Sequence, residues 1–486
     1  MSSQIPMPNP ITTFKIVSFG CKVNQAEGLA LAERLRRRGL AEVAPRGPAD
    51  LVVVNTCCVT AEAARQGRQQ VRRAARRGAA LAVTGCAAHP ASGDAALRRM
   101  EGLVAVEADK DRLLTRLADT GCVPAAAGAP TPGHERQRPA MSEASGREAL
   151  TDAHAGPGAI TPGHERSEWP GKRCQAPLTS SPPPSQPRGR AMLKVQDGCP
   201  GGCAYCIVPM VRPEVRSVPP EEAVRQAKAL VAEGFREIVV CGIHLGLYGA
   251  DLRPGSTLPS LLARLLAVEG LGRLRLSSLS PAEVDEPLLA LMAAEPDRLC
   301  PHLHLSLQSG DDAILARMVR PYTAADFLRT VERVRGTLDE PAMTTDVLVG
   351  FPGETDAAFE RTLAVCREAG FARMHVFPFS ARPGTRAATM PGRVPRDAAR
   401  QRRRQAAELG QALADAFRRR LVGRPETVAV ERLGRDGSAE GTAARYVRVR
   451  IHGPLPAGAA RRGLLPVRLD GLEGEAIVGT VRASGS

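Results

Sequence analysis

Three cysteines stand close together near the middle of the chain, in the segment Gln-Asp-Gly-Cys-Pro-Gly-Gly-Cys-Ala-Tyr-Cys-Ile-Val-Pro at 196–209. Cys199, Cys203 and Cys206 form a C-x3-C-x2-C pattern on a glycine-containing loop. Structural zinc sites usually have four ligands, whereas a four-iron cluster held by three cysteines keeps one iron free to bind another molecule. The spacing therefore favours an open iron–sulfur cluster. The alternative is a zinc site completed by a distant histidine or cysteine.

Three further cysteine-bearing loops lie near the N-terminus, each directly after a short apolar run. Cys21 follows the run 14–17, Cys57 follows 51–54, and Cys86 follows 81–83. Such continuous apolar runs, separated by helical stretches at 27–38 and 61–77, are typical of buried parallel strands. Because the loops after parallel strands emerge at one edge of the sheet, the three cysteines are predicted to converge there. The alternative is that they are small buried apolar residues.

The length, composition and charge of the chain limit which class of protein it can be. A chain of 486 residues favours two or three domains, and a hydrophobic fraction of 43% is that of a globular protein. The net charge of +15 and the pI near 9.7 favour a polyanionic partner, because lysine and arginine displace counterions from phosphates. The alternative is a basic surface that only aids solubility. Aromatic residues make up only 3%, so few side chains can stack on bases.

No apolar run is long enough to span a bilayer, and the residues before Thr13 lack the apolar core of a signal peptide. We therefore expect a cytoplasmic protein with no membrane partner. In that reducing compartment the 12 cysteines are not expected to form a disulfide framework, and metal or sulfur chemistry is the better use for the clustered ones.

The central part of the chain alternates apolar runs with helical periodicity. Strands are predicted at 193–195, 238–241, 274–277, 303–307, 344–349 and 373–377. Helices are predicted between them at 221–232, 258–267, 284–294, 324–335 and 357–369. These six βα units indicate an open, partial (β/α)6 barrel in which the loops after the strands carry the chemistry.

Two further regions complete the organisation. Residues 123–190 are rich in Pro, Ala, Gly and Ser and repeat the hexapeptide Thr-Pro-Gly-His-Glu-Arg, which predicts a disordered linker. Beyond the barrel, an arginine-rich helix is predicted at 396–420, and alternating runs at 426–430, 446–451 and 476–481 predict a small β-barrel. The expected fold class is therefore α/β, with an N-terminal parallel α/β domain at 12–122, the linker, the partial barrel and basic helix at 191–420, and a C-terminal β-barrel at 421–486.

Together these features resemble the radical S-adenosylmethionine methylthiotransferases over nearly the whole chain apart from the linker. The resemblance covers the N-terminal three-cysteine domain, the C-x3-C-x2-C domain and a C-terminal region similar to a TRAM domain. The stretches Ser-Phe-Gly-Cys-Lys-Val-Asn-Gln at 18–25 and Gly-Ile-His-Leu-Gly-Leu-Tyr-Gly at 242–249 are most similar to the subgroup that acts on N6-threonylcarbamoyladenosine beside the tRNA anticodon.

The resemblance implies two [4Fe-4S] clusters, with S-adenosyl-L-methionine as cosubstrate. Carbon 2 of adenine offers no acidic proton, so radical hydrogen abstraction suits it better than acid–base catalysis. In the family, the cluster on the central cysteines binds S-adenosylmethionine and gives a 5′-deoxyadenosyl radical. A second cluster on the N-terminal cysteines would hold a sulfur atom that is methylated and transferred to the substrate. The predicted metal ligands and catalytic residues are Cys199, Cys203, Cys206, Cys21, Cys57 and Cys86.

The resemblance also assigns residues to the cosubstrate. Polar groups and glycines near strand ends can contact its ribose or its methionine part. The predicted cosubstrate residues are Tyr205, Gly242, Gln308, Asp346 and Gly350. Tyr205 could cover the bound adenine, and plain packing is the alternative for it. His304 and His375 lie within apolar strands and are interpreted as core or barrel-lining histidines.

The chain departs from the family pattern at two places. Cys58 stands where a threonine is usual, so a ligand register shifted by one residue is an alternative, but Cys57 is preferred because it keeps the Asn-Thr-Cys spacing. Pro213 stands where a glycine is usual, which restricts the backbone of that loop. Arg212 and Arg216 on either side of it could contact RNA or the cosubstrate.

Arginine runs supply the candidate RNA contacts, with solvated helix faces as the alternative for any one run. They are the face at 65–77, Arg402, Arg403, Arg404, Arg418, Arg419, Arg420, Arg448, Arg450, Arg461 and Arg462. The remaining cysteines are assigned to no metal. Cys122 and Cys174 are interpreted as exposed thiols, and Cys241, Cys300 and Cys366 as buried packing residues.

The sequence thus predicts an enzyme, a tRNA methylthiotransferase that converts N6-threonylcarbamoyladenosine beside the anticodon to its 2-methylthio derivative. Its expected partners are the anticodon stem-loop and an electron donor such as flavodoxin or ferredoxin, and the protein is expected to be a monomer. One alternative is the same chemistry on isopentenyladenosine in tRNA or on a ribosomal-protein side chain. Another is a non-catalytic, metal-containing protein that binds RNA.

Overall fold

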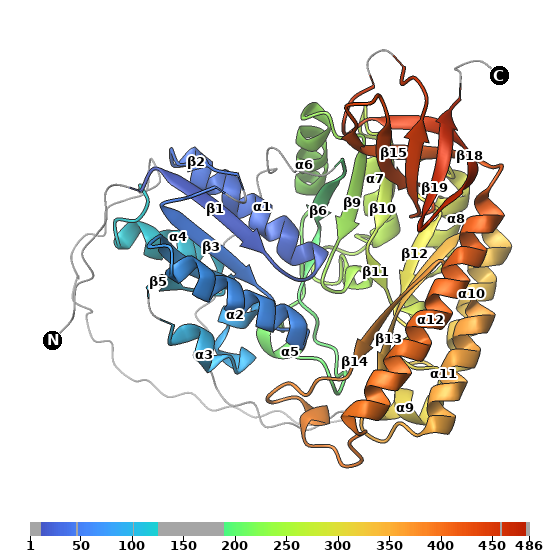
Figure 1. Cartoon of the computed structure of the whole chain (residues 1–486), viewed down its shortest axis with the longest axis horizontal. Helices are drawn as coiled ribbons and strands as arrows, with labels where there is room; N and C mark the ends of the chain where they lie inside the picture. The colour runs from blue at the N-terminus through green and yellow to red at the C-terminus, as the bar shows by residue number, and fades with distance from the viewer. Residues whose placement is uncertain (1–10, 45–46, 101, 125–188, 457–458, 483–486) are drawn as a thin grey trace, which may run out of the picture. The chain divides into compact units, whose positions relative to one another are not determined.

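The computed structural model describes residues 11–44, 47–100, 102–124, 189–456 and 459–482 (Figure 1). Most of the predicted linker, including Cys174, lies outside these described residues. Within the described part of the chain, no helix is both long enough and apolar enough to cross a membrane.

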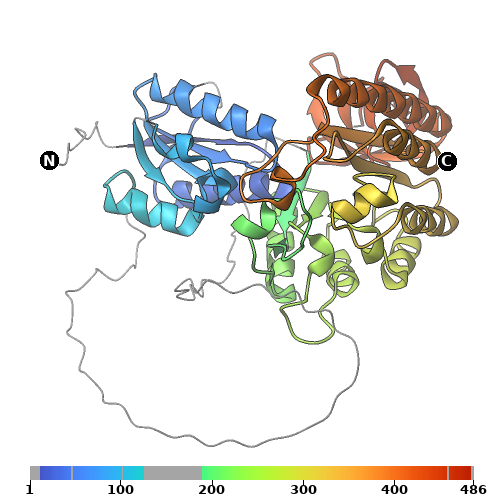
Figure 2. The same cartoon turned by 90° about the horizontal axis from the view of Figure 1, so that it is seen from below.

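The N-terminal region is a five-stranded parallel sheet in the order β2-β1-β3-β4-β5. Its strands are β1 (Thr13–Ser18), β2 (Ala41–Glu42), β3 (Leu51–Thr56), β4 (Ala80–Gly85) and β5 (Leu103–Val106). Its helices are α1 (Lys22–Arg37), α2 (Ala61–Ala75), α3 (Ala95–Arg98) and α4 (Lys110–Asp119), and Figure 2 shows helices on both faces of this sheet. The predicted parallel α/β domain is confirmed.

Alternation along β3 explains why its whole apolar run is buried. Leu51 and Val53 pack in the core cluster that contains α1 and α4, whereas Val52 and Val54 pack in the cluster that contains α2. Successive side chains of a strand point to opposite faces, so helices on both faces bury all of them. Cys122 is only 2% exposed within the first of these clusters, so the interpretation of Cys122 as an exposed thiol is wrong. The chain after α4 folds back onto the core and closes it there.

The central region is the predicted partial barrel. One parallel sheet has the order β10-β9-β6, and a second has the order β11-β12-β13-β14. The strands are β6 (Ala191–Lys194), β9 (Glu237–Cys241), β10 (Arg273–Leu276), β11 (Ser278–Leu279), β12 (His302–Leu305), β13 (Ala342–Val349) and β14 (Arg373–Pro378). The flanking helices are α6 (Pro220–Ala232), α7 (Leu258–Leu266), α8 (Glu286–Ala294), α9 (Asp312–Arg317), α10 (Ala324–Thr337) and α11 (Asp356–Ala369). All six predicted strands are present, and the two sheets meet where Leu274 bridges Leu299.

A short segment directly after β6 contains the central cysteine loop. It contains β7 (Gln196–Asp197), α5 (Val208–Val211) and β8 (Arg216–Ser217), and β7 pairs with β8 in antiparallel fashion. This pairing closes the cysteine loop at its base.

The C-terminal region is a long helix followed by a closed five-stranded barrel in the order β15-β16-β17-β19-β18 (Figure 1). Its elements are α12 (Arg396–Leu421), β15 (Pro425–Leu433), β16 (Ala439–Ala443), β17 (Arg448–His452), β18 (Leu464–Glu473) and β19 (Ala476–Val481). The predicted helix and β-barrel are confirmed, although Tyr446 lies in a turn before β17 rather than in the strand.

A buried ion triad joins this barrel to the central region. Arg273 and Arg275 lie on the same face of β10, and both pair with Glu237 of β9, with all three side chains inaccessible to solvent. Arg273 also donates to the carbonyl oxygen of Thr427 at 2.6 Å, and Arg275 to that of Ala443 at 2.9 Å. Buried charges persist only when they are paired and hydrogen-bonded, so the triad ties the two regions to one geometry.

Candidate functional site

The central cysteine loop is folded so that its three thiols lie near one another. The amide of Cys206 donates to the carbonyl of Cys203 at 3.0 Å, which forms a tight turn. The Cys206 thiol accepts from the amide of Val208, and the Cys199 thiol accepts from the amide of Gly201, each at 3.4 Å. Burial, together with the neighbouring Cys203 and Cys199 thiols, raises the pKa of Cys206 to about 12. At Cys199 burial opposes ionisation, but the contact with His244 lowers the pKa of the thiol below its usual value. A bound cation would favour the thiolates.

His244 is a functional candidate that the sequence reasoning did not single out. Its Nδ1 lies 3.2 Å from Sγ of Cys199, its Nε2 contacts the carboxylate of Glu283, and its amide donates to Oε1 of Gln196 at 2.8 Å. Burial opposes protonation of His244, but the contacts with Cys199 and Glu283 raise its pKa to about 10. The signal available in the sequence was its position directly after β9, inside the glycine-rich stretch 242–249.

The three N-terminal cysteines lie at the carboxyl ends of neighbouring strands, as predicted from their positions after β1, β3 and β4. Cys21 is the N-cap of α1, where its sulfur accepts from the amide of Asn24 at 3.5 Å. Burial raises the pKa of Cys57 to about 12, and the charges of Cys86 and Cys21 add to the rise, so the three thiols lie within electrostatic reach of one another.

The structure does not decide between Cys57 and Cys58 as the cluster ligand of this loop. A hydrogen bond from the Cys58 thiol lowers the pKa of Cys86 to about 5, and both residues belong to the same core cluster. Cys57, in contrast, lies beside Gly20, where a Cβ would come within 2.6 Å of the Cys57 sulfur. The assignment of Cys57 as ligand stays a prediction.

Both cysteine sets fit an iron–sulfur cluster by their chemistry and surroundings. Within the described residues, no group of three or more His, Cys, Asp or Glu side chains is arranged to hold a single metal ion. A four-iron cluster differs from a single ion because each thiolate binds a different iron, so its ligands stand farther apart. Three soft thiolates with no added carboxylate suit such a cluster. A side chain at Gly20 or Gly201 would crowd the sulfur of Cys57 or Cys199, because a Cβ there would lie 2.6 Å or 3.1 Å from that sulfur.

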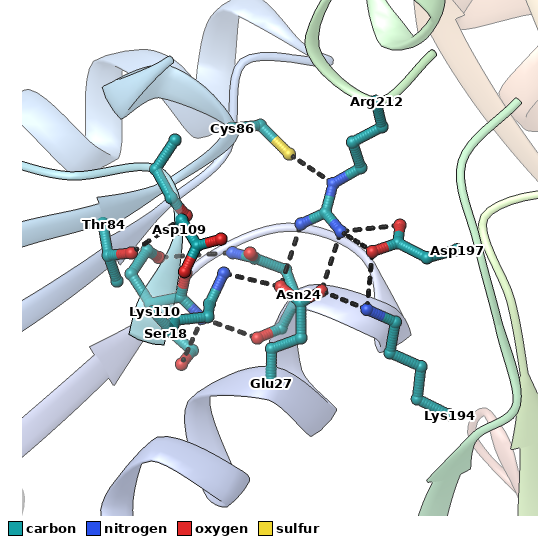
Figure 3. Close-up of polar contacts among 12 residues, drawn as sticks. Ser18, Asn24, Glu27, Thr84, Cys86, Asp109, Lys110, Lys194, Asp197 and Arg212 are labelled. Atoms are coloured by element: carbon teal, nitrogen blue, oxygen red, sulfur yellow. Dashed lines mark hydrogen bonds and ion pairs between the residues drawn. The ribbon is translucent and has the colours of Figure 1, made fainter. Parts of the chain in front are cut away.

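A buried ion network lies between the two cysteine sets (Figure 3). Nη1 of Arg212 donates to Glu27 and to Asp197, each at 2.7 Å, and its Nε lies 3.4 Å from Sγ of Cys86. Lys110 and Lys194 also donate to Glu27, each at 2.6 Å. Although burial opposes ionisation, these three cations hold the pKa of Glu27 well below its usual range.

Arg212 is joined to both cysteine loops at once. Its side chain contacts Cys86, and its backbone carbonyl accepts a hydrogen bond from the amide of Cys199 at 3.0 Å. The expectation that Arg212 contacts RNA is not supported, because its guanidinium is enclosed and faces Glu27, Asp197 and Cys86. Arg216 is exposed and pairs with Glu214, so an RNA contact by Arg216 stays a prediction.

The predicted cosubstrate residues lie at or near the carboxyl ends of the barrel strands. Asp346 of β13 lies 3.4 Å from Nε2 of His304, and the backbone of Gln308 has φ +65° and donates to the carbonyl of Asp346 at 2.8 Å. Gly242 and Gly350 follow β9 and β13. Tyr205 packs edge-on against Phe351, with ring centroids 6.4 Å apart. Their contacts with the cosubstrate stay predictions.

Two of the predicted RNA-binding arginines lie inside the fold, which corrects their assignment. Arg402 is 6% exposed and pairs with Glu354 and Asp356, each at 2.7 Å. Arg418 is 9% exposed and pairs with Asp415. The ion pairs of both arginines hold them inside the fold, so they are not available to phosphates. Arg403, Arg404, Arg419, Arg420, Arg448 and Arg461 are exposed, and their RNA contacts stay predictions.

Comparison with known proteins agrees with this geometry. The radical SAM superfamily matches residues 193–366, and uncharacterized protein family UPF0004 matches residues 13–107. The chain is 31% identical to the threonylcarbamoyladenosine tRNA methylthiotransferase of Thermotoga maritima, over 95% of this chain and 98% of that one. It is 32% identical to the tRNA-2-methylthio-N(6)-dimethylallyladenosine synthase of Moorella thermoacetica, over 86% and 87%.

Solved structures show the same fold at low sequence identity. The radical S-adenosylmethionine methyltransferase TsrM from Kitasatospora setae superimposes with a TM-score of 0.51 at 15% identity, over 77% of this chain and 74% of that one. The two matched families together span the N-terminal sheet and most of the partial barrel, and the alignment with the Thermotoga maritima relative covers 95% of this chain. The chain therefore belongs to the methylthiotransferase family of radical S-adenosylmethionine enzymes.

Proposed function

We propose that this enzyme converts N6-threonylcarbamoyladenosine beside the tRNA anticodon to its 2-methylthio derivative, using two [4Fe-4S] clusters and S-adenosylmethionine. The observation that carries the proposal is the presence of two separate three-cysteine sets, which Arg212 links through Cys86 and Cys199. A single radical cluster would need only the central set. A reaction that also delivers sulfur needs a second place to hold it.

Different residues of the chain would serve the two clusters. When bound, the clusters and S-adenosylmethionine supply radical hydrogen abstraction and the transferred methylthio group. Cys199, Cys203 and Cys206 would hold the first cluster with one iron left open to the cosubstrate. His244, fixed by Glu283, would orient the Cys199 sulfur by its contact at 3.2 Å, as partners of metal ligands commonly do. Cys21, Cys57 and Cys86 would hold the second cluster.

Four considerations support tRNA as the substrate. The chain carries a net charge of +15, a closed C-terminal barrel and exposed arginines on α12 and β17. The relatives named above are tRNA enzymes by name. The choice between threonylcarbamoyladenosine and isopentenyladenosine rests on less, because relatives of both kinds are about equally similar. An electron donor such as flavodoxin or ferredoxin and a monomeric state are part of the proposal.

The test uses anaerobically reconstituted protein. We expect about eight irons per chain, 5′-deoxyadenosine after reduction in the presence of S-adenosylmethionine, and a methylthio product on tRNA that carries threonylcarbamoyladenosine. Mass spectrometry of the digested nucleosides identifies the product. A product only on tRNA with isopentenyladenosine would select that alternative. Zinc in place of iron, with no cleavage of S-adenosylmethionine, would instead point to a non-catalytic RNA-binding protein.

A further inference from the structure

A cavity of about 920 Å³ lies between β14, α12 and the C-terminal barrel. Its walls carry more positive than negative charge, because six arginines line it against three glutamates, although one of the six, Arg418, is paired with Asp415. The arginines are Arg190, Arg373, Arg403, Arg418, Arg448 and Arg450. Thr344 and His375 also line it, so the cavity reaches the strands of the partial barrel. A cavity of this size and sign can take an anionic group of a substrate.

Tyr446 is held at the edge of this cavity in a strained conformation. Its φ of +61° lies in the left-handed region, which is rare for a bulky residue and marks functional sites more often than others. His302 stacks on its ring with centroids 4.3 Å apart. Three cations surround the ring, with Arg275 at 5.2 Å and Lys22 and Arg190 each at 5.8 Å from its centroid.

Two cations, Arg373 in the wall of the cavity and Lys22 over the ring of Tyr446, have no carboxylate partner among the described residues. Within the described residues, no carboxylate lies within ion-pair distance of Lys22 or Arg373, whereas Arg190 and Arg275 pair with glutamates. Lys22 is half-buried beside the Tyr446 ring. Half-burial of Lys22 without a partner is unfavourable, and an anion from outside the chain would pair with Lys22 and with the exposed Arg373.

The cavity lies near residues predicted to bind the second cluster and the cosubstrate, so an anion bound there would be close to the reacting base. Lys22 directly follows Cys21, a predicted ligand of the second cluster, and lies next to Tyr446. On the other side, His375 pairs in register with Asp346, a predicted cosubstrate residue. In adenine, carbon 2 is separated from the carbon that bears N6 by a single ring nitrogen. An adenine placed with carbon 2 at the sulfur site therefore has its N6 substituent close by.

We propose that Lys22 and Arg373, with Tyr446 between the surrounding cations, bind the carboxylate of the N6 substituent and so select threonylcarbamoyladenosine over adenosines with an apolar substituent. The inference rests on the proposed function and adds the residues that choose the substrate. A dimethylallyl group has no charge to pair with these cations and would displace water from them without replacing its hydrogen bonds, which is a basis for rejection. An RNA phosphate shares the anionic chemistry and is the competing source.

The test measures binding of three anticodon stem-loops of one sequence to the reconstituted holoenzyme. They carry threonylcarbamoyladenosine, unmodified adenosine or dimethylallyladenosine at the target position. We expect wild type to prefer the first by about tenfold or more. In Lys22→Met and Arg373→Gln this preference should fall by about threefold to tenfold, while affinity for the unmodified stem-loop stays within about twofold. Arg400→Gln, on the exposed surface of α12, is the matched control and should change neither value.

The possible outcomes separate the carboxylate from a phosphate. Equal weakening of all three stem-loops in the two variants would show that the cations contact the RNA backbone, which overturns the inference. An intact preference in both variants would overturn it as well. Arg373 is exposed, so Arg373→Gln keeps the test valid if Lys22→Met fails to fold. Failure of the proposed function is seen separately, as the absence of methylthio product when wild type is given the first stem-loop.

Discussion

The two cysteine sets of this enzyme are built in different ways. The central three lie within residues 199–206 on one loop, which internal hydrogen bonds and the β7–β8 pair hold in shape. The N-terminal three come from loops after β1, β3 and β4, and they meet only because those strands are neighbours in one parallel sheet. The first set depends on local spacing, and the second depends on strand order. A change in the sheet should therefore harm the second set and spare the first.

The contact through Arg212 limits this independence. Arg212 belongs to the segment after the central loop, yet its side chain reaches Cys86 and Glu27 of the N-terminal region. Arg212, a neighbour of the second set, therefore belongs to the region that holds the first set. Substitutions on either side of this contact test how far the two cysteine sets are independent.

The largest effect is expected from removing one cysteine of each set. Cys203→Ala should abolish both 5′-deoxyadenosine and methylthio product, because the first cluster starts the reaction. Cys86→Ala should keep S-adenosylmethionine cleavage and abolish only the methylthio product, because in the proposed reaction the second set holds the sulfur. The two products are measured in one anaerobic assay by mass spectrometry. Loss of cleavage in Cys86→Ala, with the iron of the first cluster retained, would contradict the division of roles.

The next effect distinguishes Cys57 from Cys58. If Cys57 is the ligand, Cys57→Ser should lower the iron content from about eight to about four per chain, and Cys58→Ser should leave it near eight. The reverse result would establish the shifted register, in which Cys58 beside Cys86 binds the cluster. Cys241→Ser, at a buried position assigned to no metal, is the matched control and should keep all the iron.

Arg212→Gln tests the link between the two regions. Breaking a buried ion pair costs about 3–5 kcal/mol, and we expect the lower end because Glu27 keeps Lys110 and Lys194. The measurement is the free energy of unfolding of the apoprotein by denaturant. Arg216→Gln, which removes an exposed arginine paired with Glu214, should cost less than about 0.5 kcal/mol. Equal stability of Arg212→Gln and wild type would show that the two regions are held together elsewhere.

The same contrast explains which parts of the site the sequence could predict. The central loop is a continuous motif, and the N-terminal strands are apolar runs whose loops must share an edge, so both cysteine sets were predictable. Helix α1 begins at Lys22, five residues before the predicted start, because Cys21 caps it, and cysteine is not among the usual N-cap residues. The prediction that Cys122 is exposed failed because the core closes over the end of α4.

Contacts between distant charged residues were not predictable. Glu27 and Arg212 are 185 residues apart, and His244 and Glu283 are 39 apart. Nothing in the local pattern of either residue distinguishes a buried partner from a solvated charge. The burial of Arg402 illustrates this, because its neighbours Arg403 and Arg404 in the same run are exposed. Only the packing of α12 against α11 decides which arginine of the run faces inward.

The smallest effect is expected from the buried Glu237 triad, which joins the central region to the C-terminal barrel. The central barrel can hold the first set independently only if its own attachment to the C-terminal barrel is stable, and the Glu237 triad provides that attachment. Burial opposes ionisation of Glu237, but Arg273 and Arg275 lower its pKa to about 2. Its unfolded value is near 4.3, so the folded pKa is depressed, and the stabilisation is present above about pH 4.3 and lost as the pH falls toward about 2.

Wild type should therefore lose up to about 3 kcal/mol of stability from this group across that interval, and Glu237→Gln should lack this component because glutamine does not titrate. Denaturant unfolding of the two apoproteins at pH 5 and pH 3 checks this, with the difference between the proteins as the readout, since other carboxyl groups cancel. Glu221→Gln, which removes an exposed carboxylate, should show the pH dependence of wild type. If Glu237→Gln also keeps that dependence, the triad does not carry charge in the folded protein, and the C-terminal barrel is held by apolar packing of Phe417 and Leu421 instead.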